Sequence, residues 1–326
     1  MKTRTTKFAA MAAACFVGSA AYAGTTVVPQ KKGPPIDDTS ESCISGDIGF
    51  DVVTEYISKG IVLENQGFII QPYADLHFKI YKSDGPLSSV TADIGIWNSF
   101  HGHHSLKGAG HEQQAAALAA AGLPNPSSTP GWYEFDFSAG LTATFGNFSV
   151  GPHLRVYESP SDVFANIYTL GLDVSYDDHD LLGAFALHPR ALVELNLIHS
   201  AGNGSRPNGS GANGQYYEVG IAPGHTWGDV TFTLPITVGF GSGDFYEGNR
   251  GFGFFSIGGD LAYALSFIPK CLGEWSIHGG AAYYRLGEGA ARFVPAQSGY
   301  DPAIGFFNTR GDRNQFVFTG GMKVAF

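Results

Sequence analysis

Long apolar runs, positive charge and cysteine are all scarce in this sequence, and each shortage excludes a class of protein. After residue 23 no segment approaches the roughly 18 consecutive apolar residues of a membrane-spanning helix. With 19 Lys and Arg against 29 Asp and Glu, the chain lacks the basic surface that nucleic-acid binding requires. Only three cysteines occur, and none has a context that suggests catalysis. No fixed-period repeat is found, which excludes a glycine-rich β-solenoid.

Residues 1–23 have the three parts of a secretory signal peptide. The positive start is carried by Lys2, Arg4 and Lys7. An apolar run at 8–17 follows, and Ala21-Tyr22-Ala23 is a small-x-small cleavage site. We expect cleavage to leave a chain that begins at Gly24, with 16 Lys and Arg, 29 Asp and Glu and a net charge of −13. A lipoprotein site around Cys15 is the weaker alternative, because Ala12 stands where a larger aliphatic residue is expected.

Residues 24–46 are rich in Pro, Lys, Asp and Ser and show no apolar period. This composition predicts a flexible periplasmic lead-in, with the folded part of the chain at 47–326.

Side chains of opposite character alternate along most of 47–326. In the clearest case, the positions from Phe68 to Ile80 are apolar at every second residue, while the positions between them are polar or charged. The last stretch, 314–326, places Met322, Val324 and Phe326 on one face and Lys323 on the other. Strand side chains point to opposite faces with a period of two, so we expect about twelve strands with one apolar face each.

The connections between these strands alternate in length. Short turns are expected at 82–88, 145–147, 177–180, 224–228 and 268–273, and longer loops at 101–131, 201–215, 241–251 and 287–313. Short periplasmic turns and long outer loops are typical of outer-membrane barrels. The sequence therefore predicts an all-β fold, a transmembrane antiparallel up-and-down β-barrel that closes by pairing 47–59 with 314–326. Aromatic residues near strand ends, Tyr56 and Tyr133 among them, are expected to form interface girdles.

The polar faces of the strands would line the lumen of this barrel. The expected lining residues are Asp51, Glu55, Lys59, Gln71, Tyr73, Asp75, His77, Lys79, Glu134, Asp136, Arg155, Arg190 and Glu194. Opposed charges in a hydrated pore would set solute preference. Interlocking ion pairs that close the lumen are the alternative, because about twelve strands leave at most a narrow passage.

Three smaller features concern specific sites. Cys43 and Cys271 would both face the oxidising periplasm, where a disulfide between them could tie the lead-in to the barrel; two unrelated thiols are the alternative. Imidazoles at His101, His103, His104 and His111 could bind a metal, but a polar outer loop is the better interpretation, so no metal or cofactor is expected. No local motif joins His153, His188 or His199 to a nucleophile, so no enzyme is expected.

One short stretch resembles a known family. Thr54, Tyr56, Lys59 and Gly60, followed by Gln66-Gly67, are similar to the first hairpin of TorF-like putative porins, which carries Ser-x-Tyr-x-x-Arg-Gly and then Gln-Gly. Thr54 replaces the Ser and Lys59 replaces the Arg, and the similarity covers about 15 residues. The terminal Phe326 also resembles the signal by which the barrel-assembly machinery recognises Gram-negative outer-membrane barrels. These resemblances imply a barrel with a presumed transport role.

From these features we expect a Gram-negative outer-membrane protein in contact with membrane lipid, able to form oligomers. The expected function is a porin-like channel for small polar solutes with a narrow charged lumen. A closed barrel that displays its long loops as an adhesin, receptor or structural surface is the alternative.

Overall fold

The computed structural model describes residues 42–64, 68–102, 131–160, 166–197, 214–242, 245–246, 251–291 and 313–326. The expected signal peptide at 1–23, almost all of the lead-in, and His103, His104, His111 and His199 lie outside these residues.

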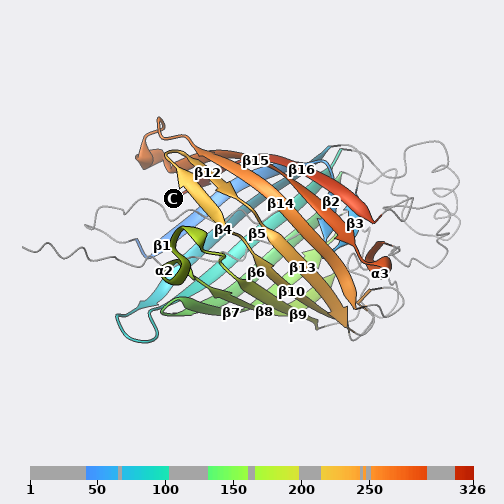
Figure 1. Cartoon of the computed structure of the whole chain (residues 1–326), viewed down its shortest axis with the longest axis horizontal. Coiled ribbons are helices and arrows are strands. Elements are labelled where there is room, and N and C mark those ends of the chain that lie inside the picture. Colours follow the sequence, from blue (N-terminus) through green and yellow to red (C-terminus); the bar gives the residue numbers. More distant parts are fainter. Residues whose placement is uncertain are drawn as a thin grey trace, which may run out of the picture.

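Twelve antiparallel strands form the wall of one closed barrel (Figure 1). In chain order they are β1 (Ile44–Val53), β4 (Ile69–Lys82), β5 (Ser89–His101), β6 (Trp132–Phe145), β7 (Phe148–Glu158), β8 (Ile167–Tyr176), β9 (Arg190–Asn196), β10 (Gln215–Ile221), β13 (Ile236–Ser242), β14 (Phe252–Ala264), β15 (Glu274–Leu286) and β16 (Asn314–Ala325). Each wall strand pairs with the next along the chain, and β1 pairs with β16 to close the ring. The predicted up-and-down barrel of about twelve strands is therefore confirmed.

The exterior of the wall is apolar and its interior is polar. Ile48, Leu141 and Leu154 are each about half exposed, whereas the polar residues that alternate with such apolar residues along each strand are mostly buried. An exposed apolar surface of this extent would cause a soluble protein to aggregate, but in a bilayer it faces lipid. The barrel is therefore a transmembrane barrel.

The two ends of the barrel differ. The start of β1 and the short β4–β5, β6–β7 and β14–β15 connections lie at one end, on the left in Figure 1, which we name the turn end. The long connections, residues 102–131, 197–214 and 287–313, leave from the opposite end, which we name the loop end.

Two prolines break the ladder at the turn end. Pro223 separates β10 from β11 (Gly224–Trp227), and Pro235 separates β12 (Val230–Thr233) from β13. Proline has no N–H to donate to a ladder, so each long strand becomes two pieces. The hairpin β11–β12 then pairs with β14 through β12.

The helical segments are short. They are α2 (His179–Leu182), η2 (Gly183–Phe185), η3 (Lys270–Leu272) and α3 (Glu288–Ala291). No helix in the described part of the chain is long and apolar enough to span a bilayer. The expected strand from Phe185 onward begins only at Arg190, because Phe185 ends η2 and residues 186–189 are irregular.

The closing seam was predicted in part. β1 pairs with β16 from Asp47↔Ala325 to Val53↔Thr319, and Gly46 and Phe326 exchange backbone hydrogen bonds of 2.9 Å. The predicted extension of this strand to residue 59 is wrong. Thr54 makes the last contacts with β16, where its N–H donates to the Phe318 carbonyl and its hydroxyl accepts from the Phe318 N–H. Beyond Thr54 the chain leaves the wall.

Candidate functional site

Residues 54–64, which follow β1, turn into the lumen, and we name them the lumen hairpin. They contain β2 (Tyr56–Ser58) and β3 (Ile61–Glu64), which pair only with each other, so that among the described strands they form a separate two-stranded sheet. Every residue of both strands is buried. Figure 1 shows this hairpin near the loop end.

The tip of the lumen hairpin is the two-residue turn Lys59-Gly60. Both residues have positive φ, 52° and 82°, which is the signature of a type I′ turn. Asn or Gly is preferred at the first position, and a lysine there costs about 1 kcal/mol of steric strain. Gly60 is needed for a second reason, because a Cβ at this position would lie 2.7 Å from the Cδ1 atom of Phe254 on β14.

Apolar contacts hold the hairpin against the wall. Tyr56, Ile57, Ile61, Val62 and Leu63 are each no more than 2% exposed and belong to one buried cluster. The wall and rim contribute Trp97, Tyr133, Tyr157, Tyr216, Phe254, Tyr284 and Leu286 to it. At about 1.5 kcal/mol or more for each buried side chain, these five residues favour the seated hairpin by on the order of 8 kcal/mol.

A second inward contact comes from the connection between β13 and β14. Phe245 and Tyr246 are each 1% exposed, and the Tyr246 hydroxyl donates a 2.6 Å hydrogen bond to the Lys59 carbonyl. Gly241 and Gly253 make room for the Tyr246 ring, because a Cβ at either position would lie closer than 3.0 Å to it. The hairpin tip is thus held from a second side.

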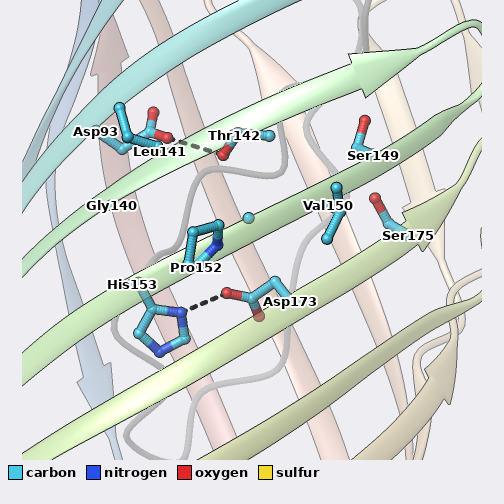
Figure 2. Close-up of a pocket in the computed structure, with 11 residues that line it drawn as sticks. Asp93, Gly140, Leu141, Thr142, Ser149, Val150, Pro152, His153, Asp173 and Ser175 are labelled. Atoms are coloured by element: carbon cyan, nitrogen blue, oxygen red, sulfur yellow. Dashed lines mark hydrogen bonds and ion pairs between the residues drawn. The ribbon is translucent and has the colours of Figure 1, made fainter.

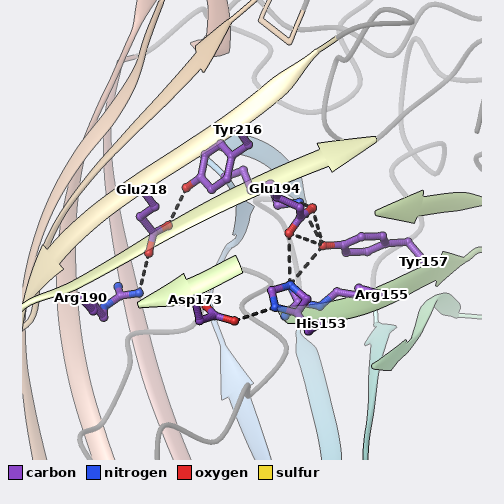
Figure 3. A network of polar contacts seen from close by, with 9 residues as sticks. His153, Arg155, Tyr157, Asp173, Arg190, Glu194, Tyr216 and Glu218 are labelled. Atoms are coloured by element: carbon purple, nitrogen blue, oxygen red, sulfur yellow. Dashed lines mark hydrogen bonds and ion pairs between the residues drawn. The ribbon is translucent and has the colours of Figure 1, made fainter. Parts of the chain in front are cut away.

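The side chain of Lys59 ends in a buried polar cluster on the opposite wall. Its Nζ atom pairs with the Glu194 carboxylate and donates to the Tyr157 hydroxyl at 3.0 Å. The Tyr157 hydroxyl in turn donates to Glu194 at 3.2 Å and accepts from Arg155 at 3.2 Å (Figure 3). The ring of Tyr216 lies 5.5 Å from Nζ. We refer to Glu194, Tyr157 and Tyr216 as the ammonium cage.

Further buried polar groups lie beside this cluster. Glu134 and Asp136 on β6 are each 1% exposed, and Glu134 accepts a 2.8 Å hydrogen bond from Tyr56 of the hairpin. Gln71 and Thr169 are fully buried, and their side-chain polar atoms meet no partner among the described residues. Such atoms are ordinarily satisfied by water, so this layer has the polar character of a lumen and not of a dry core.

Histidine–aspartate pairs occupy the half of the lumen nearer the turn end. The contact distances are 2.7 Å from His77 Nδ1 to Asp93 and 2.6 Å from His278 Nε2 to Asp51. The third pair, His153–Asp173 at 2.6 Å, lines a shallow pocket on β5–β8 (Figure 2). The Asp173 side chain remains 29% exposed, so solvent reaches this half more easily than the hairpin tip.

All thirteen residues expected to line the lumen lie in the described part of the chain. Eight are buried: Asp51, Lys59, Gln71, His77, Glu134, Asp136, Arg155 and Glu194. Five are partly exposed: Glu55, Tyr73, Asp75, Lys79 and Arg190. The structure brings Lys59, Arg155 and Glu194 together, and joins Arg190 to Glu218 at 2.7 Å. Glu55 and Lys59 belong to the inward segment and not to the wall. A solute-selecting role for this set remains a prediction.

Several residues of the site were not predicted. Tyr56 and Tyr133 were expected in a membrane-interface girdle, and this was wrong, because both are buried inside the barrel. Tyr216 and Phe254, which receive the hairpin tip, had no distinguishing pattern in the sequence. A signal for the hairpin existed in the consecutive apolar residues Tyr56-Ile57 and Ile61-Val62-Leu63, because a strand with one lipid face and one polar face alternates.

The predicted disulfide is absent. Cys43 and Cys271 are exposed free thiols. Cys43 precedes β1 and Cys271 precedes β15, and β16 lies between these strands. Two strand spacings amount to about 10 Å, whereas the two Cα atoms of a disulfide are less than about 7 Å apart.

His101, the one residue of the predicted histidine cluster in the described part of the chain, is held by contacts with its neighbours. Its Nε2 atom lies 2.9 Å from the Ser99 hydroxyl, and its ring stacks on Tyr133 with centroids 4.4 Å apart. Within the described ranges, no three His, Cys, Asp or Glu side chains are grouped to hold a metal ion. The remaining histidines of the predicted cluster lie outside those ranges.

Comparisons with known proteins give no family. No family model matches the sequence, and no curated protein matches it, so the resemblance to TorF-like porins is not confirmed. Among solved structures, an outer-membrane channel from Pseudomonas putida F1 aligns with TM-score 0.41 and 7% identity over 87% of this chain and 95% of that chain. The NanC porin aligns with TM-score 0.37 and 10% identity over 86% and 98% of the two chains.

A third solved structure, outer membrane phospholipase A from Escherichia coli, aligns with TM-score 0.36 and 11% identity over 86% of this chain and 92% of that chain. At these scores the alignments carry no argument about function. The expectation that this chain is not an enzyme remains a prediction.

Proposed function

We propose that this protein is an outer-membrane channel for small polar solutes. The lumen hairpin closes the channel, and displacement of the hairpin opens it. The observation that carries the proposal is the hairpin itself. It sits in a polar, charged lumen as a separate sheet, attached to the wall through side chains and the chain connections at its two ends. A plug without a backbone ladder to the wall can leave without breaking the barrel.

The orientation follows from the two ends of the barrel. Short turns face the periplasm and long loops face outward in outer-membrane barrels. The turn end is then periplasmic, and the hairpin closes the outer half of the lumen.

Burial of the hairpin favours the closed state. Five apolar side chains leave water when the hairpin is seated, and this gain opposes the conformational entropy lost in ordering the segment. A stimulus that stabilises the open state, such as a bound solute or an applied voltage, would shift this balance. The channel would then be a gated one.

A closed barrel that displays its loop end is the second candidate. The same apolar packing favours it, because a hairpin buried this completely is also how a barrel would be sealed permanently. The two functions differ in one property, which is whether the hairpin leaves the lumen of the native protein.

A reversible cross-link tests this difference. A Cβ at Gly60 would lie 3.1 Å from the Cβ of Phe254, slightly closer than in a disulfide, and Phe254→Cys removes the ring that this Cβ would otherwise meet. After a small shift of the hairpin, Gly60→Cys with Phe254→Cys can therefore form a disulfide between hairpin and wall. Cys43→Ser and Cys271→Ser remove the native thiols from the background. Single-channel current in planar bilayers is measured under oxidising and reducing conditions. We expect voltage-driven openings that vanish on oxidation and return on reduction.

Gly60→Cys with Phe254→Ser, and Gly60→Ser with Phe254→Cys, are the matched controls, because each removes the Phe254 ring but keeps only one thiol. Their currents should not respond to the redox state. Folding is checked by electrophoresis in a denaturing detergent, in which a folded barrel migrates differently before and after heating. If the folded wild-type protein and the reduced double variant both pass no current over the accessible voltages, the channel is rejected in favour of the closed barrel.

A further inference from the structure

We propose that the lumen wall carries a binding site for a primary ammonium group, which Lys59 occupies while the hairpin is seated. A solute with a primary ammonium group takes the same site when the hairpin leaves. This inference rests on the proposed channel function and names the class of solute, small organic cations.

The contacts of the Lys59 ammonium are those of a bound ligand. Glu194 supplies the charge and the Tyr157 hydroxyl accepts a hydrogen bond of 3.0 Å. The rings of Tyr157 and Tyr216 lie 4.8 Å and 5.5 Å from Nζ, within the range of cation–π attraction. A carboxylate with two aromatic faces is the arrangement by which proteins recognise ammonium ligands.

The ammonium cage belongs to the wall and is held together without the hairpin. Tyr157 is on β7, Glu194 on β9 and Tyr216 on β10. Tyr157 donates to Glu194, and the Tyr216 hydroxyl donates to Glu218 at 2.6 Å, which pairs with Arg190 (Figure 3). These wall-to-wall contacts keep the cage in shape when Lys59 withdraws.

The backbone conformation at position 59 is unfavourable for lysine, which suggests that the ammonium group itself is required there. Lys59 has φ of 52°, a conformation for which Asn or Gly is the better residue. Strain of this kind persists where a functional group requires it. The strained residue here is the one that places a cation in the cage.

The charge of the lumen on the turn-end side suits a cation. Aspartates at positions 47, 51, 75, 93 and 173 face it from β1, β4, β5 and β8. The cations are Lys79, Arg190 and Lys323 on β4, β9 and β16, and histidines pair with Asp51, Asp93 and Asp173. A lumen with an excess of carboxylates attracts cations and repels anions. A cationic solute entering from this side would reach Glu194 along a favourable path.

Chemical rescue tests the site without requiring current. Lys59→Ala removes the tethered ammonium, and the melting temperature of the detergent-solubilised protein is measured against n-butylammonium concentration. We expect the variant to melt lower than wild type, and n-butylammonium to raise its melting temperature by several degrees in a saturable way. n-Butanol, which has the chain without the charge, and tetraethylammonium, which has no N–H, should not do so.

Three variants complete the experiment. Lys59→Gly removes the ammonium, leaves its volume open and suits the positive φ, so it should respond to n-butylammonium as Lys59→Ala does, which covers the case in which the alanine variant does not fold. Adding Glu194→Gln to either variant should abolish the response. Lys79→Ala, which removes a lumen lysine outside the cage, should show none.

The possible results separate the two proposals. If n-butylammonium shifts neither Lys59 variant, Lys59 is a structural latch and the ammonium site is rejected, even if the channel conducts. If the shift appears and depends on Glu194 but the protein never conducts, the site stands and the channel is rejected. Saturable rescue together with n-butylammonium-dependent opening of the wild-type channel supports both.

Discussion

The two halves of the lumen are built on different principles. The half nearer the loop end is closely packed, with the apolar hairpin side chains no more than 2% exposed and two cations sharing Glu194. The half nearer the turn end has His–Asp pairs and keeps some solvent exposure, as at Asp173. Under the proposed function, closure of this barrel depends on an inserted segment, because the interior of the wall carries charged as well as aromatic residues and would admit water once that segment left.

The largest effect is expected from a charge inside the packed half. Ile57→Asp places a carboxylate at a position that is 1% exposed, where burial of an isolated charge costs several kcal/mol. The hairpin should leave the lumen. Trypsin should then cleave after Lys59, which is 6% exposed in the native protein, and the conductance should become permanent.

Ile57→Val is the matched control. It removes one methylene at a cost of about 1 kcal/mol and should leave Lys59 protected. Protection of Lys59 in a folded Ile57→Asp variant would mean that the hairpin is not an independent plug.

Removing one carboxylate from each half should give unequal losses of stability. Glu194→Gln leaves Lys59 and Arg155 buried without their shared anion, and we expect a cost of about 3 kcal/mol. Asp51→Asn breaks one contact with His278, and both side chains are 12% exposed, so water can replace part of the interaction and the cost should be nearer ~1 kcal/mol. Denaturant titration of the purified barrels measures both, and equal costs would remove the distinction between the halves.

A smaller loss is expected at the pocket of Figure 2. Asp173→Asn breaks the contact with His153, but the Asp173 side chain is 29% exposed, so water replaces much of the interaction. We expect less than about 1 kcal/mol in the same titration, as for solvent-screened pairs. A loss as large as that of Glu194→Gln would show that this half is as tightly closed as the other.

The smallest effect should be local and lies outside both halves, in the β8–β9 turn. Partial burial of Asp178 opposes ionisation, but the N–H groups of Leu187 and His188 donate to its carboxylate and hold its pKa below the usual value. Because the folded-state pKa is the lower one, this contribution is present above about pH 4 and is lost as the pH falls through the lowered pKa.

Hydrogen-exchange protection of the Leu187 and His188 amides should therefore decrease in acid in the wild-type protein. In Asp178→Asn, which cannot ionise, protection in this turn should not change over the same pH range. Acid-dependent protection that persists in the variant would assign the effect to another group.

The wall could be predicted from the sequence because a period of two assigns each side chain to lipid or lumen. Leu76 and Ile94 face outward, and their neighbours His77 and Asp93 meet inside across β4 and β5. The strand boundaries were less predictable. The expected first strand ran through Glu55 to residue 59 because its alternation continues to Tyr56, and the consecutive apolar residues that interrupt it begin only after the chain has left the sheet at Thr54.

The docking position of the hairpin and its cage could not be predicted, because they depend on contacts between distant strands. Lys59 meets Glu194, 135 residues away, and Tyr246 reaches the Lys59 carbonyl over 187 residues. Periodicity gives the face of a strand on which a residue lies but not which strands lie opposite one another across a barrel. The positive φ of Lys59 is similarly invisible in the sequence, since a Lys-Gly pair is a poorer turn signal than Asn-Gly.

The register between β1 and β4 has a consequence for protein engineering. These strands pair directly from Ile44↔Phe78 to Val53↔Ile69, so the ladder between them extends to the points where the chain leaves and rejoins the wall. The intervening segment can therefore be exchanged, and other hairpins of similar length could be inserted between Thr54 and Phe68 without shifting the register between β1 and β4. The barrel could therefore serve as a scaffold for engineered sensors, in which the sequence of the inserted hairpin determines which stimulus opens the channel.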